Sequence, residues 1–455
     1  MRGWSPERIA AAAGARLAAP GRVDGGPERV VIDSRQAAPG ALFVGLPGEN
    51  VDGGRFAGAA LAAGAWGVLV GAEHAEGLDG PGVVLAAQHP LDALQRLASA
   101  WRVQVGAAVI GVTGSTGKTS TKDLLAALLA GQRRTVASRA NFNTEIGLPL
   151  EILSAPAGTE VLVLEMAMRG PGQIAELAAI SRPDVGVIVN IGPVHLELLG
   201  SLEAIAAAKA ELLAGLAPGA TAIVPAGEAL LEPHLRADLR TLTFGPGGDV
   251  CLAAQDGERV EIDCAGESVV LEVPFTQRHL RHNLLAAVAA ARAVGVRPQG
   301  RVALALSAGR GQSEALAGDV TLLDDSYNAN PMSMRAALDH LDAVARAGGA
   351  ARRRVAVLGD MLELGPRELD FHAEIGAHAQ ALGIDVLVTV GPLAAVMDRE
   401  FSGELHAVQD ATAAAGLLPG LVAGGDVVLV KASRGVGLEV VCAALRGDGA
   451  IVAQR

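Results

Sequence analysis

Short apolar runs alternate with amphipathic segments along most of this chain. The runs at 107–114, 160–165 and 184–192 are almost wholly aliphatic, and each is followed by a segment with helical spacing. Apolar strands that alternate with helices are typical of a mostly parallel sheet covered on both faces. We therefore predict a central α/β domain over residues 105–312.

The pattern extends to both sides of this central unit. Residues 1–104 hold four short β-type runs between glycine-rich turns and a closing helix at about 91–104, which predicts a small α/β domain. Residues 313–455 hold four more strand-like runs separated by helices, which predicts a Rossmann-like third domain with its ligand-binding loops at the carboxyl ends of the strands. Residues 250–275 predict two antiparallel hairpins, and a helix is expected to follow at 279–295.

The predicted helix at 201–216 places a charged residue on its apolar face. At ~100° per residue, its large apolar side chains form one stripe: Leu202, Ile205, Leu212, Leu213 and Leu216. Lys209 lies in the middle of this stripe, whereas Glu203 and Glu211 point away from it. A lysine in such a place usually extends its ammonium to the rim of the core. The alternative is that burial lowers the pKa of Lys209, leaving a neutral amine that can form a carbamate with CO₂.

Composition makes this lysine more conspicuous. Only four of the 37 basic residues are lysines: Lys118, Lys122, Lys209 and Lys431. Because arginine serves at most other positive positions, a retained lysine hints at a need for a compact ammonium or a reactive amine. For Lys122, one helical turn after Lys118, the spacing favours a solvated surface lysine.

Charge and cysteine content exclude several classes of protein. The net charge of −12 argues against a general nucleic-acid binder, which would need a basic face, but it allows a local basic pocket for a phosphorylated small molecule. Three cysteines, at a spacing that fits neither a zinc site nor a disulfide framework, indicate a reducing compartment. The longest uncharged run, 56–72, is short for a membrane span, so we expect a cytoplasmic protein.

The strongest single motif follows the strand at 107–114. The loop "TGSTGKT" at 113–119 leads into a helix, so its backbone amides can wrap phosphate oxygens at a helix N-terminus. Lys118 would reach the β- and γ-phosphates, and the Thr119 hydroxyl would ligate Mg²⁺. The loop departs from the strict Walker pattern because Val112 stands where glycine is usual. We predict nucleotide binding by Thr113, Gly114, Ser115, Thr116, Gly117, Lys118 and Thr119.

Two further residues lie at the same predicted sheet edge. Glu165 ends the strand at 160–165, and His195 follows the strand at 184–192. Glu165 could hold the Mg²⁺ that bridges the phosphates, although aspartate is more usual there. Taken alone, Glu165 is equally a charge at a strand end, and His195 a loop residue bonded to its neighbours.

Taken together, the phosphate loop, Glu165, His195 and Lys209 have a pattern that resembles that of the Mur ligases, ATP-dependent amide-forming enzymes of peptidoglycan precursor synthesis. The resemblance spans essentially the whole chain. It rests on the phosphate loop and on "NFNTEIGLPL", "EMAMRGPGQI", "NIGPVHLELLGS", "DDSYNANPMSM" and "VLGDMLELG". The segment "DDSYNANP" at 324–331 is the most discriminating, because it is similar to the branch that adds a D-alanyl-D-alanine dipeptide. The expected fold is the three-domain α/β architecture of the family.

The resemblance implies an activity and a set of roles. ATP would phosphorylate the terminal carboxylate of a UDP-N-acetylmuramoyl-tripeptide, and the amine of D-alanyl-D-alanine would attack the acyl phosphate. The catalytic residues would be Lys118, His195 and Lys209, with Thr119, Glu165, His195 and a carbamylated Lys209 holding two Mg²⁺ ions. Asn283, Arg310 and Asp325 would contact the nucleotide; Ser34, Arg35, Asn143, Thr144, Tyr327 and Asn328 would contact the substrates. We expect a monomer that binds neither nucleic acid nor membrane.

Some points stay open at this level. Gly54 stands where the family branch more often carries histidine, so the contact made there is in doubt. The third residue of the tripeptide and the roles of Lys431, Ser433 and Arg434 are not determined. A sister ligase that adds one amino acid, or a folate polyglutamate ligase, is an alternative that "DDSYNANP" disfavours. A P-loop kinase or regulatory ATPase would explain the phosphate loop but not the lysine on the apolar stripe.

Overall fold

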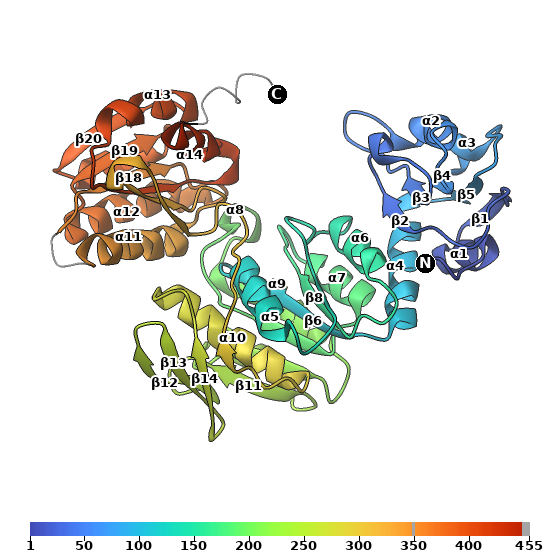
Figure 1. Cartoon of the computed structure of the whole chain (residues 1–455), viewed down its shortest axis with the longest axis horizontal. Coiled ribbons are helices and arrows are strands. Elements are labelled where there is room, and N and C mark those ends of the chain that lie inside the picture. The colour runs from blue at the N-terminus through green and yellow to red at the C-terminus, as the bar shows by residue number, and fades with distance from the viewer. Residues whose placement is uncertain (348–350, 448–455) are drawn as a thin grey trace.

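The computed structural model describes residues 1–347 and 351–447, and it has three lobes (Figure 1). The N-terminal lobe and the third lobe lie apart on opposite sides of the central one. Each lobe is built on its own sheet. The predicted three-part α/β fold is confirmed.

The N-terminal lobe holds a five-stranded sheet in the order β1-β5-β4-β3-β2. Only β1 is antiparallel to its neighbour. The strands are β1 (Arg16–Ala19), β2 (Arg29–Val31), β3 (Ala41–Val44), β4 (Gly67–Gly71) and β5 (Val83–Ala87). The helices are α1 (Pro6–Ala13), α2 (Ala57–Ala62), α3 (Ala72–Ala75) and α4 (Pro90–Val105), with short 3-10 turns at Ser34–Gln36 and Gly53–Phe56.

The central lobe holds a ten-stranded mixed sheet in the order β15-β14-β13-β12-β11-β10-β9-β6-β8-β7. Its parallel part comprises β6 (Ala108–Thr113), β7 (Thr135–Ala137), β8 (Val161–Glu165), β9 (Val185–Ile188), β10 (Thr221–Pro225) and β11 (Arg240–Phe244). The predicted hairpins are β12 (Val250–Asp256), β13 (Arg259–Cys264) and β14 (Glu267–Glu272), beside the short β15 (Gly300–Arg301). The helices are α5 (Lys118–Leu129), α6 (Gly147–Ser154), α7 (Gln173–Ser181), α8 (Leu196–Leu199), α9 (Leu202–Ala214) and α10 (Arg278–Ala293), and a 3-10 turn lies at Glu232–His234.

The third lobe holds a six-stranded sheet in the order β16-β17-β21-β18-β19-β20, parallel except for β16 at one edge. The strands are β16 (Gln312–Ala315), β17 (Thr321–Asp324), β18 (Arg354–Gly359), β19 (Val386–Val390), β20 (Glu404–Val408) and β21 (Val427–Lys431). The helices are α11 (Pro331–Arg346), α12 (Glu368–Leu382), α13 (Ala411–Leu421) and α14 (Glu439–Arg446). Short 3-10 helices lie at Ala317–Asp319, Gly365–Arg367, Ala394–Glu400 and Arg434–Val436.

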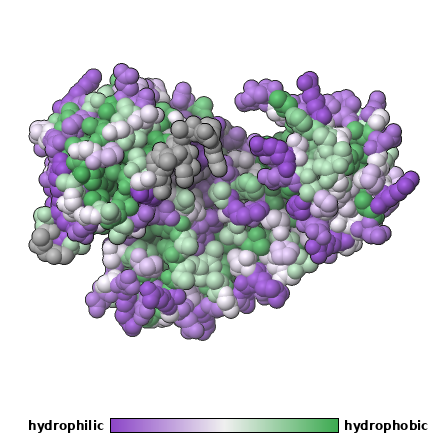
Figure 2. Space-filling view, turned by 45° about the horizontal axis from the view of Figure 1, so that its top comes forward, coloured by the Kyte–Doolittle hydropathy of each residue, from purple (hydrophilic) through white to green (hydrophobic). Residues whose placement is uncertain are grey.

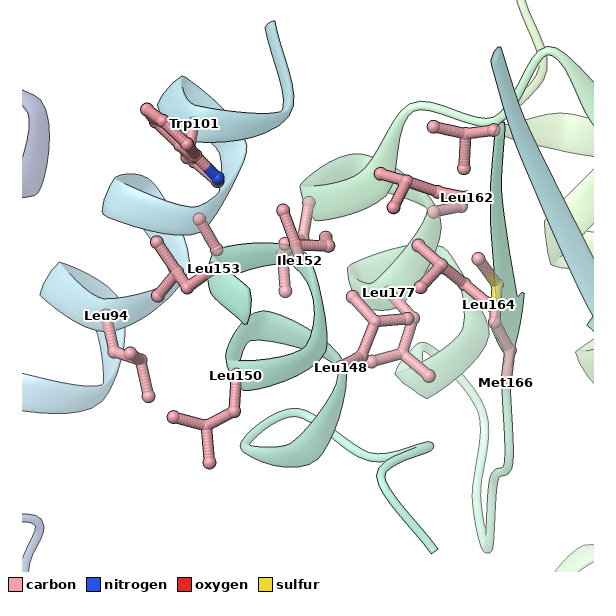
Figure 3. Close-up of a cluster of buried hydrophobic side chains, with 14 of the residues drawn as sticks. Leu94, Trp101, Leu148, Leu150, Ile152, Leu153, Leu162, Leu164, Met166 and Leu177 are labelled. Carbon is pink, nitrogen blue, oxygen red and sulfur yellow. The ribbon is translucent and has the colours of Figure 1, made fainter. Parts of the chain in front are cut away.

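Alternation along the strands sends side chains to two faces of the central sheet. On β8, Val161 and Val163 join the cluster with α5 and α10, whereas Leu162 and Leu164 join the cluster with α6, α7 and α9. The second cluster continues through α4 into the N-terminal lobe (Figure 3). Trp101 on α4 packs there and donates a hydrogen bond to the Ala155 carbonyl at 3.0 Å. The first two lobes therefore share one hydrophobic core.

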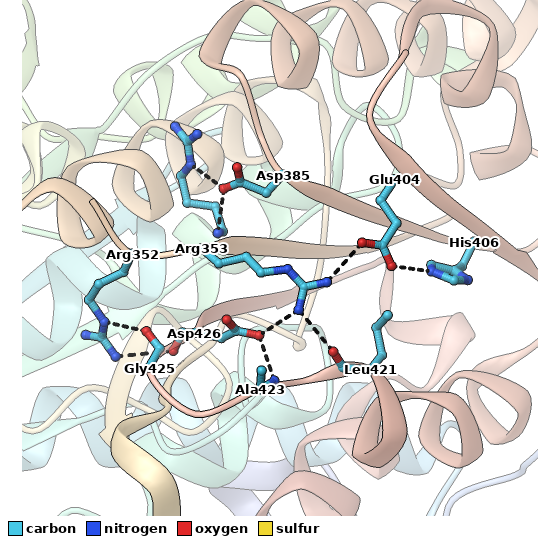
Figure 4. A network of polar contacts seen from close by, with 10 residues as sticks. Arg352, Arg353, Asp385, Glu404, His406, Leu421, Ala423, Gly425 and Asp426 are labelled. Atoms are coloured by element: carbon cyan, nitrogen blue, oxygen red, sulfur yellow. Dashed lines mark hydrogen bonds and ion pairs between the residues drawn. The ribbon is translucent and has the colours of Figure 1, made fainter. Parts of the chain in front are cut away.

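The third lobe has its own core on the two faces of its sheet. A polar network closes the amino ends of its strands (Figure 4). Arg353 pairs with Glu404 at 3.0 Å and with the buried Asp426 at 3.3 Å. Arg352 donates to the carbonyls of Gly425 and Asp426 at 2.7 and 3.2 Å. This lobe is thus tied together internally, and it meets the rest of the chain mainly through loops.

Within the described ranges, which omit 348–350 and 448–455, no helix has the length and apolar character needed to cross a membrane.

Candidate active site

The phosphate loop lies at the carboxyl end of β6, as predicted. Gly114 and Gly117 have φ of 156° and 74°, which suit residues without a side chain. Asn190, just beyond β9, supports the loop: its amide oxygen accepts from Thr116 N at 2.9 Å, and its amide nitrogen donates to Thr116 Oγ1 at 2.9 Å. Lys118 bends over the loop, donating to the Gly114 carbonyl at 2.7 Å.

Asn283 on α10 lies directly against this loop. It is buried, and its amide oxygen would come within 2.6 Å of a Cβ at Gly117. Gly117 therefore serves both the left-handed turn and the close approach of α10. The structure brings the predicted nucleotide residues of α5 and α10 together.

Lys209 is buried on α9, with 2% of its surface exposed. Its stripe partners Ile205, Leu212 and Leu213 are fully buried. Burial, and then the neighbouring charge of Lys118, hold the pKa of Lys209 well below its ordinary value. Across the described residues, the amine has neither a hydrogen bond nor an ion pair. The rim position favoured by the pattern alone is therefore wrong, and the buried alternative holds.

Glu165 is also buried, at the end of β8. One carboxylate oxygen accepts from Asn143 Nδ2 at 2.9 Å, while Oε2 lacks a hydrogen-bond partner in the described part of the chain. A buried carboxylate oxygen without a partner is costly, and a hard cation is a suitable partner for it. Thr119, buried at the start of α5, adds a hydroxyl oxygen. The residues present therefore fit a Mg²⁺ site.

His195 lies at the junction with the third lobe, next to α8. Burial lowers its pKa, and the charges of Lys118 and Lys209 act in the same direction, whereas contact with Glu363 opposes them. Glu165 and Arg310 also act electrostatically on Lys118, whose pKa is lowered mainly by burial. Lys118 is thus electrostatically coupled to Glu165, Arg310, His195 and Lys209.

The segment after β17 presents charged and aromatic groups of the third lobe. Asp325 pairs with the buried Lys431 at 2.5 Å, and Lys431 also donates to the Asn328 carbonyl at 2.9 Å. Tyr327 lies between two guanidinium groups, with Arg310 4.0 Å and Arg434 4.7 Å from its ring centroid. Lys431 therefore fixes the loop after β17, and its ion pair keeps Asp325 in contact with the third lobe.

Ser433 acts on a neighbouring loop of the same lobe. Its hydroxyl accepts from Leu362 N at 2.9 Å and donates to the Ala329 carbonyl at 3.4 Å. The hydroxyl thus joins the segment after β17 to the one after β18. The structure gives Lys431 and Ser433 structural contacts that the sequence left undetermined.

The predicted substrate residues lie at separate places. Asn143 contacts Glu165, and Thr144 beside it is exposed. Ser34 and the exposed Arg35 follow β2 in the N-terminal lobe, where Arg35 pairs with Asp33 at 2.7 Å. A hollow separates the first and third lobes (Figure 2). The structure does not bring Ser34 and Arg35 together with the residues of the third lobe.

A histidine from another element fills the space next to Gly54. A Cβ at Gly54 would lie 2.2 Å from Cδ2 of His74, and His74 Nε2 is 2.9 Å from Asp52 Oδ2. Asp52 also accepts from Gly54 N at 2.8 Å. His74 follows β4, so it lies at the same carboxyl edge of the sheet as Ser34. Because Gly54 has no side chain, the imidazole of His74 on α3 can occupy the space beside it.

Two sequence predictions outside this set are wrong. Lys122 is buried, not solvated, and bonds to the Ser138 carbonyl at 2.9 Å and Asp123 at 2.6 Å. Leu202, assigned to the buried stripe, is 38% exposed because it begins α9 directly after the cap Ser201.

Three residues of this region were not identified from the sequence. Asn190 stands in the quoted segment "NIGPVHLELLGS" and Glu363 in "VLGDMLELG", so position within matching segments was a usable signal. His74 had no signal in the sequence.

Comparison with known proteins gives three family matches along the chain. Residues 28–102 match the Mur ligase family catalytic domain, 112–291 the Mur ligase middle domain and 309–434 the Mur ligase glutamate ligase domain. These matches follow the three lobes in order.

Relatives and solved structures cover nearly the whole chain. The UDP-N-acetylmuramoyl-tripeptide–D-alanyl-D-alanine ligase of Synechocystis sp. is 39% identical, with 92% of each chain covered, and that of Escherichia coli is 34% identical, with 93% of this chain and 94% of its own covered. The crystal structure of MurF from Acinetobacter baumannii has a TM-score of 0.86 at 28% identity, covering 98% and 99% of the two chains. MurF ligase from Thermotoga maritima in complex with ADP has a TM-score of 0.80 at 30% identity, covering 93% and 98%.

Proposed function

This chain belongs to the Mur ligase family, and from that premise we propose that it joins D-alanyl-D-alanine to UDP-N-acetylmuramoyl-tripeptide. ATP is converted to ADP and phosphate, and the product is the UDP-muramoyl-pentapeptide precursor of peptidoglycan. The observation that carries this proposal is the similarity to relatives that bear this activity in their names, across at least nine-tenths of both chains. ATP as a substrate favours a cytoplasmic location, and we expect a monomer.

The domains divide the work in our proposal. Residues 1–104 bind the UDP-linked substrate, with Ser34 and Arg35 near the nucleotide. Residues 105–312 bind ATP through the phosphate loop, Asn283 and Arg310. Residues 313–455, of which 348–350 and 448–455 lie outside the described part, bind the dipeptide and bring Asp325 toward ATP.

The chemistry requires two anions to meet. The tripeptide carboxylate attacks the γ-phosphate of ATP, giving an acyl phosphate and ADP. The amine of D-alanyl-D-alanine then attacks the acyl carbon, and phosphate leaves from the tetrahedral intermediate. Lys118 offsets the charge repulsion, Asn143 and Thr144 position the carboxylate, and Tyr327 and Asn328 position the incoming amine.

We propose that two Mg²⁺ ions are held by Thr119, Glu165, His195 and a carbamylated Lys209. When bound, they neutralise phosphate charge and polarise the phosphoryl group. The neutral Lys209 amine adds to CO₂, forming an N–C bond and releasing one proton. This reaction replaces a nitrogen without a partner by oxygen ligands of the kind Mg²⁺ prefers, and its support is the burial of Lys209 beside Lys118.

The test is product formation by the purified chain. ADP release is measured with UDP-N-acetylmuramoyl-tripeptide and either D-alanyl-D-alanine or single amino acids, and product mass is determined. We expect release only with the dipeptide, and a product heavier by the dipeptide less one water. Equal turnover with a single amino acid would indicate a sister ligase, and ATP turnover without an amide product would indicate a kinase or ATPase.

A further inference from the structure

The third lobe reaches the predicted metal site through one side chain. Glu363 lies in the loop between β18 and the 3-10 helix Gly365–Arg367, and its carboxylate contacts Nδ1 of His195. The other carboxylate oxygen lies 3.7 Å from Nε of Arg169 in the central lobe. Both side chains of the His195–Glu363 pair are about one-third exposed, at 27% and 34%. A residue of one lobe thus touches a predicted metal ligand of another.

Both partners adopt a backbone conformation that is unusual for residues with side chains. The φ angles of His195 and Glu363 are 53° and 63°. Such conformations persist where the surroundings impose them, and they gather at functional sites. The contact is therefore built into two strained loops.

The loops around the pair approach each other closely. Glu197 N donates to the Glu363 carbonyl at 3.4 Å. A Cβ at Gly365 would lie 3.0 Å from Cα of Glu197, and Leu196 packs against the core of the third lobe. Backbone and apolar contacts thus place Glu363 opposite His195.

The chemistry of this contact selects one form of the imidazole. A carboxylate can only accept a hydrogen bond, so Nδ1 of a neutral His195 must donate. The lone pair then stays on Nε2, which has no hydrogen-bond partner among residues 1–347 and 351–447. A carboxylate on one ring nitrogen is the usual arrangement when the other nitrogen binds a metal.

We propose that Glu363 is a positioning residue: docking of the third lobe places its carboxylate on Nδ1 of His195 and fixes the tautomer whose Nε2 can bind Mg²⁺. The site in the central lobe is then complete only when the third lobe is docked. This inference rests on the proposed function for the identity of the metal, but the tautomer itself does not depend on it.

The tautomer is read directly by NMR of the full chain labelled with ¹⁵N-histidine, without substrate or metal. His195→Asn assigns one of the ten histidines. We expect the Nδ1–H form in the unmodified chain at pH 7.5 and a shift toward Nε2–H in Glu363→Ala. Glu197→Ala, which removes a neighbouring exposed carboxylate, is the matched control and should leave the tautomer unchanged. An Nε2–H form or an imidazolium in the unmodified chain, or an unchanged signal in Glu363→Ala, would overturn the proposal.

Metal binding supplies the second readout. Titration of Mn²⁺ with ADP present, followed by EPR, should show affinity reduced about 10- to 100-fold in Glu363→Ala and unchanged in Glu197→Ala. Glu363→Gln, which keeps an acceptor, should lie between them. Equal Mn²⁺ affinity in Glu363→Ala and the unmodified chain would count against the proposal. Neither the tautomer nor the Mn²⁺ affinity requires turnover. Both measurements can therefore be interpreted even if the chain does not join D-alanyl-D-alanine to the tripeptide.

Discussion

At the scale of single residues, two buried lysines of the central lobe differ in their surroundings. The ammonium of Lys122 bonds to Asp123 and to the Ser138 carbonyl, so its charge is compensated. Lys209 has apolar neighbours and the positive charge of Lys118 instead. Because a charge without a partner is disfavoured in a core, Lys209 favours the neutral amine, which is the form that reacts with CO₂.

Replacement of Lys209 tests this difference. Lys209→Ala and Lys209→Arg should each reduce amide formation at least ~100-fold while ATP still binds, because neither side chain can form a carbamate. Addition of a short carboxylic acid should partly restore Lys209→Ala, since its oxygens can fill the gap. A ¹³C signal from ¹³CO₂-treated protein should disappear in both variants. Full activity in Lys209→Arg would contradict the carbamate.

Gly54 is a residue where absence of a side chain matters. In Gly54→Ala, the new Cβ would overlap the His74 ring, so the ring must leave Asp52, and stability should fall by about 1 kcal/mol. In a His74→Ala background the obstacle is gone, so the same substitution should cost much less. Thermal unfolding of the four proteins measures this coupling. Strictly additive effects would show that the two residues do not interfere.

At the scale of elements, two of the three charged residues of α9 make different contributions. Lys209 faces the core, whereas Glu211 accepts hydrogen bonds from Gly172 N at 2.7 Å and Ala175 N at 3.0 Å. These amides belong to the N-terminus of α7, where helical amides lack partners. Helix α9 thus caps α7 through Glu211 and contributes Lys209 to the predicted metal site.

Glu211→Ala should therefore affect structure and not chemistry. Loss of the cap should lower stability by about 1 kcal/mol and speed hydrogen exchange at Gly172 and Ala175, with kcat unchanged. Glu203→Ala, on the exposed side of the same helix, is the control and should change neither kcat nor hydrogen exchange at Gly172 and Ala175. A large loss of kcat in Glu211→Ala would show that the cap also positions Lys209.

At the scale of the whole molecule, the lobes are joined unequally. The first two share one core through α4, while the third has separate cores. The third lobe meets the central lobe through isolated contacts: Glu363 with His195, Gln277 with His340 at 3.0 Å, and Leu196 against the core of the third lobe. Burial of apolar surface resists separation more than such contacts do. We therefore expect substrate-induced closure to move the third lobe.

Small-angle scattering tests this expectation. The radius of gyration should fall when ATP and the tripeptide substrate are both present, because closure excludes water from the acyl phosphate. Trp101 and other residues of the core shared by the first two lobes should keep their hydrogen exchange unchanged. Similar scattering profiles with and without substrates would count against closure.

Acid should weaken the docking of the third lobe. Burial lowers the pKa of His279 and His340 to about 4. The charge of Lys431 lowers the pKa of His279 further, whereas Asp339 raises it. The charge of His279 lowers the pKa of His340 further, whereas Asp325 raises it. Undocking would expose His279 on α10 of the central lobe and His340 on α11 of the third lobe. The undocked chain then binds more protons between pH 4 and the ordinary value of 6.5, and docking is lost as pH falls through this window.

Scattering at pH 7.5 and 5.0 measures this dependence. We expect expansion at pH 5.0 in the unmodified chain and little pH effect in His279→Gln/His340→Gln. His406→Gln, on β20 at the far edge of the third sheet, is the control and should behave as the unmodified chain. Equal expansion in the double variant would assign the effect to other groups.

Much of the fold could be predicted because its signals are local. Buried strands such as β6, β8 and β9 are apolar except for a polar residue at the end of β6 and of β8, and the phosphate loop combines strand, glycines and helix within one stretch of sequence. Seven of the described strands were not predicted: β1, β7, β10, β11, β15, β16 and β20. Five of them lie at sheet edges, where their residues are partly exposed, whereas β10 and β11 lie inside the central sheet.

The sequence by itself determined the three α/β units, the phosphate loop and the identity of the residues around it. Each of these depends on periodicity or on residues close together in the chain. Only the tertiary structure decided that Lys209 is buried beside Lys118, that Lys122 is compensated, that His74 lies against Gly54, and that Glu363 contacts His195. The physical reason is that burial, and the partners which set charge state and tautomer, are supplied by segments far apart in sequence.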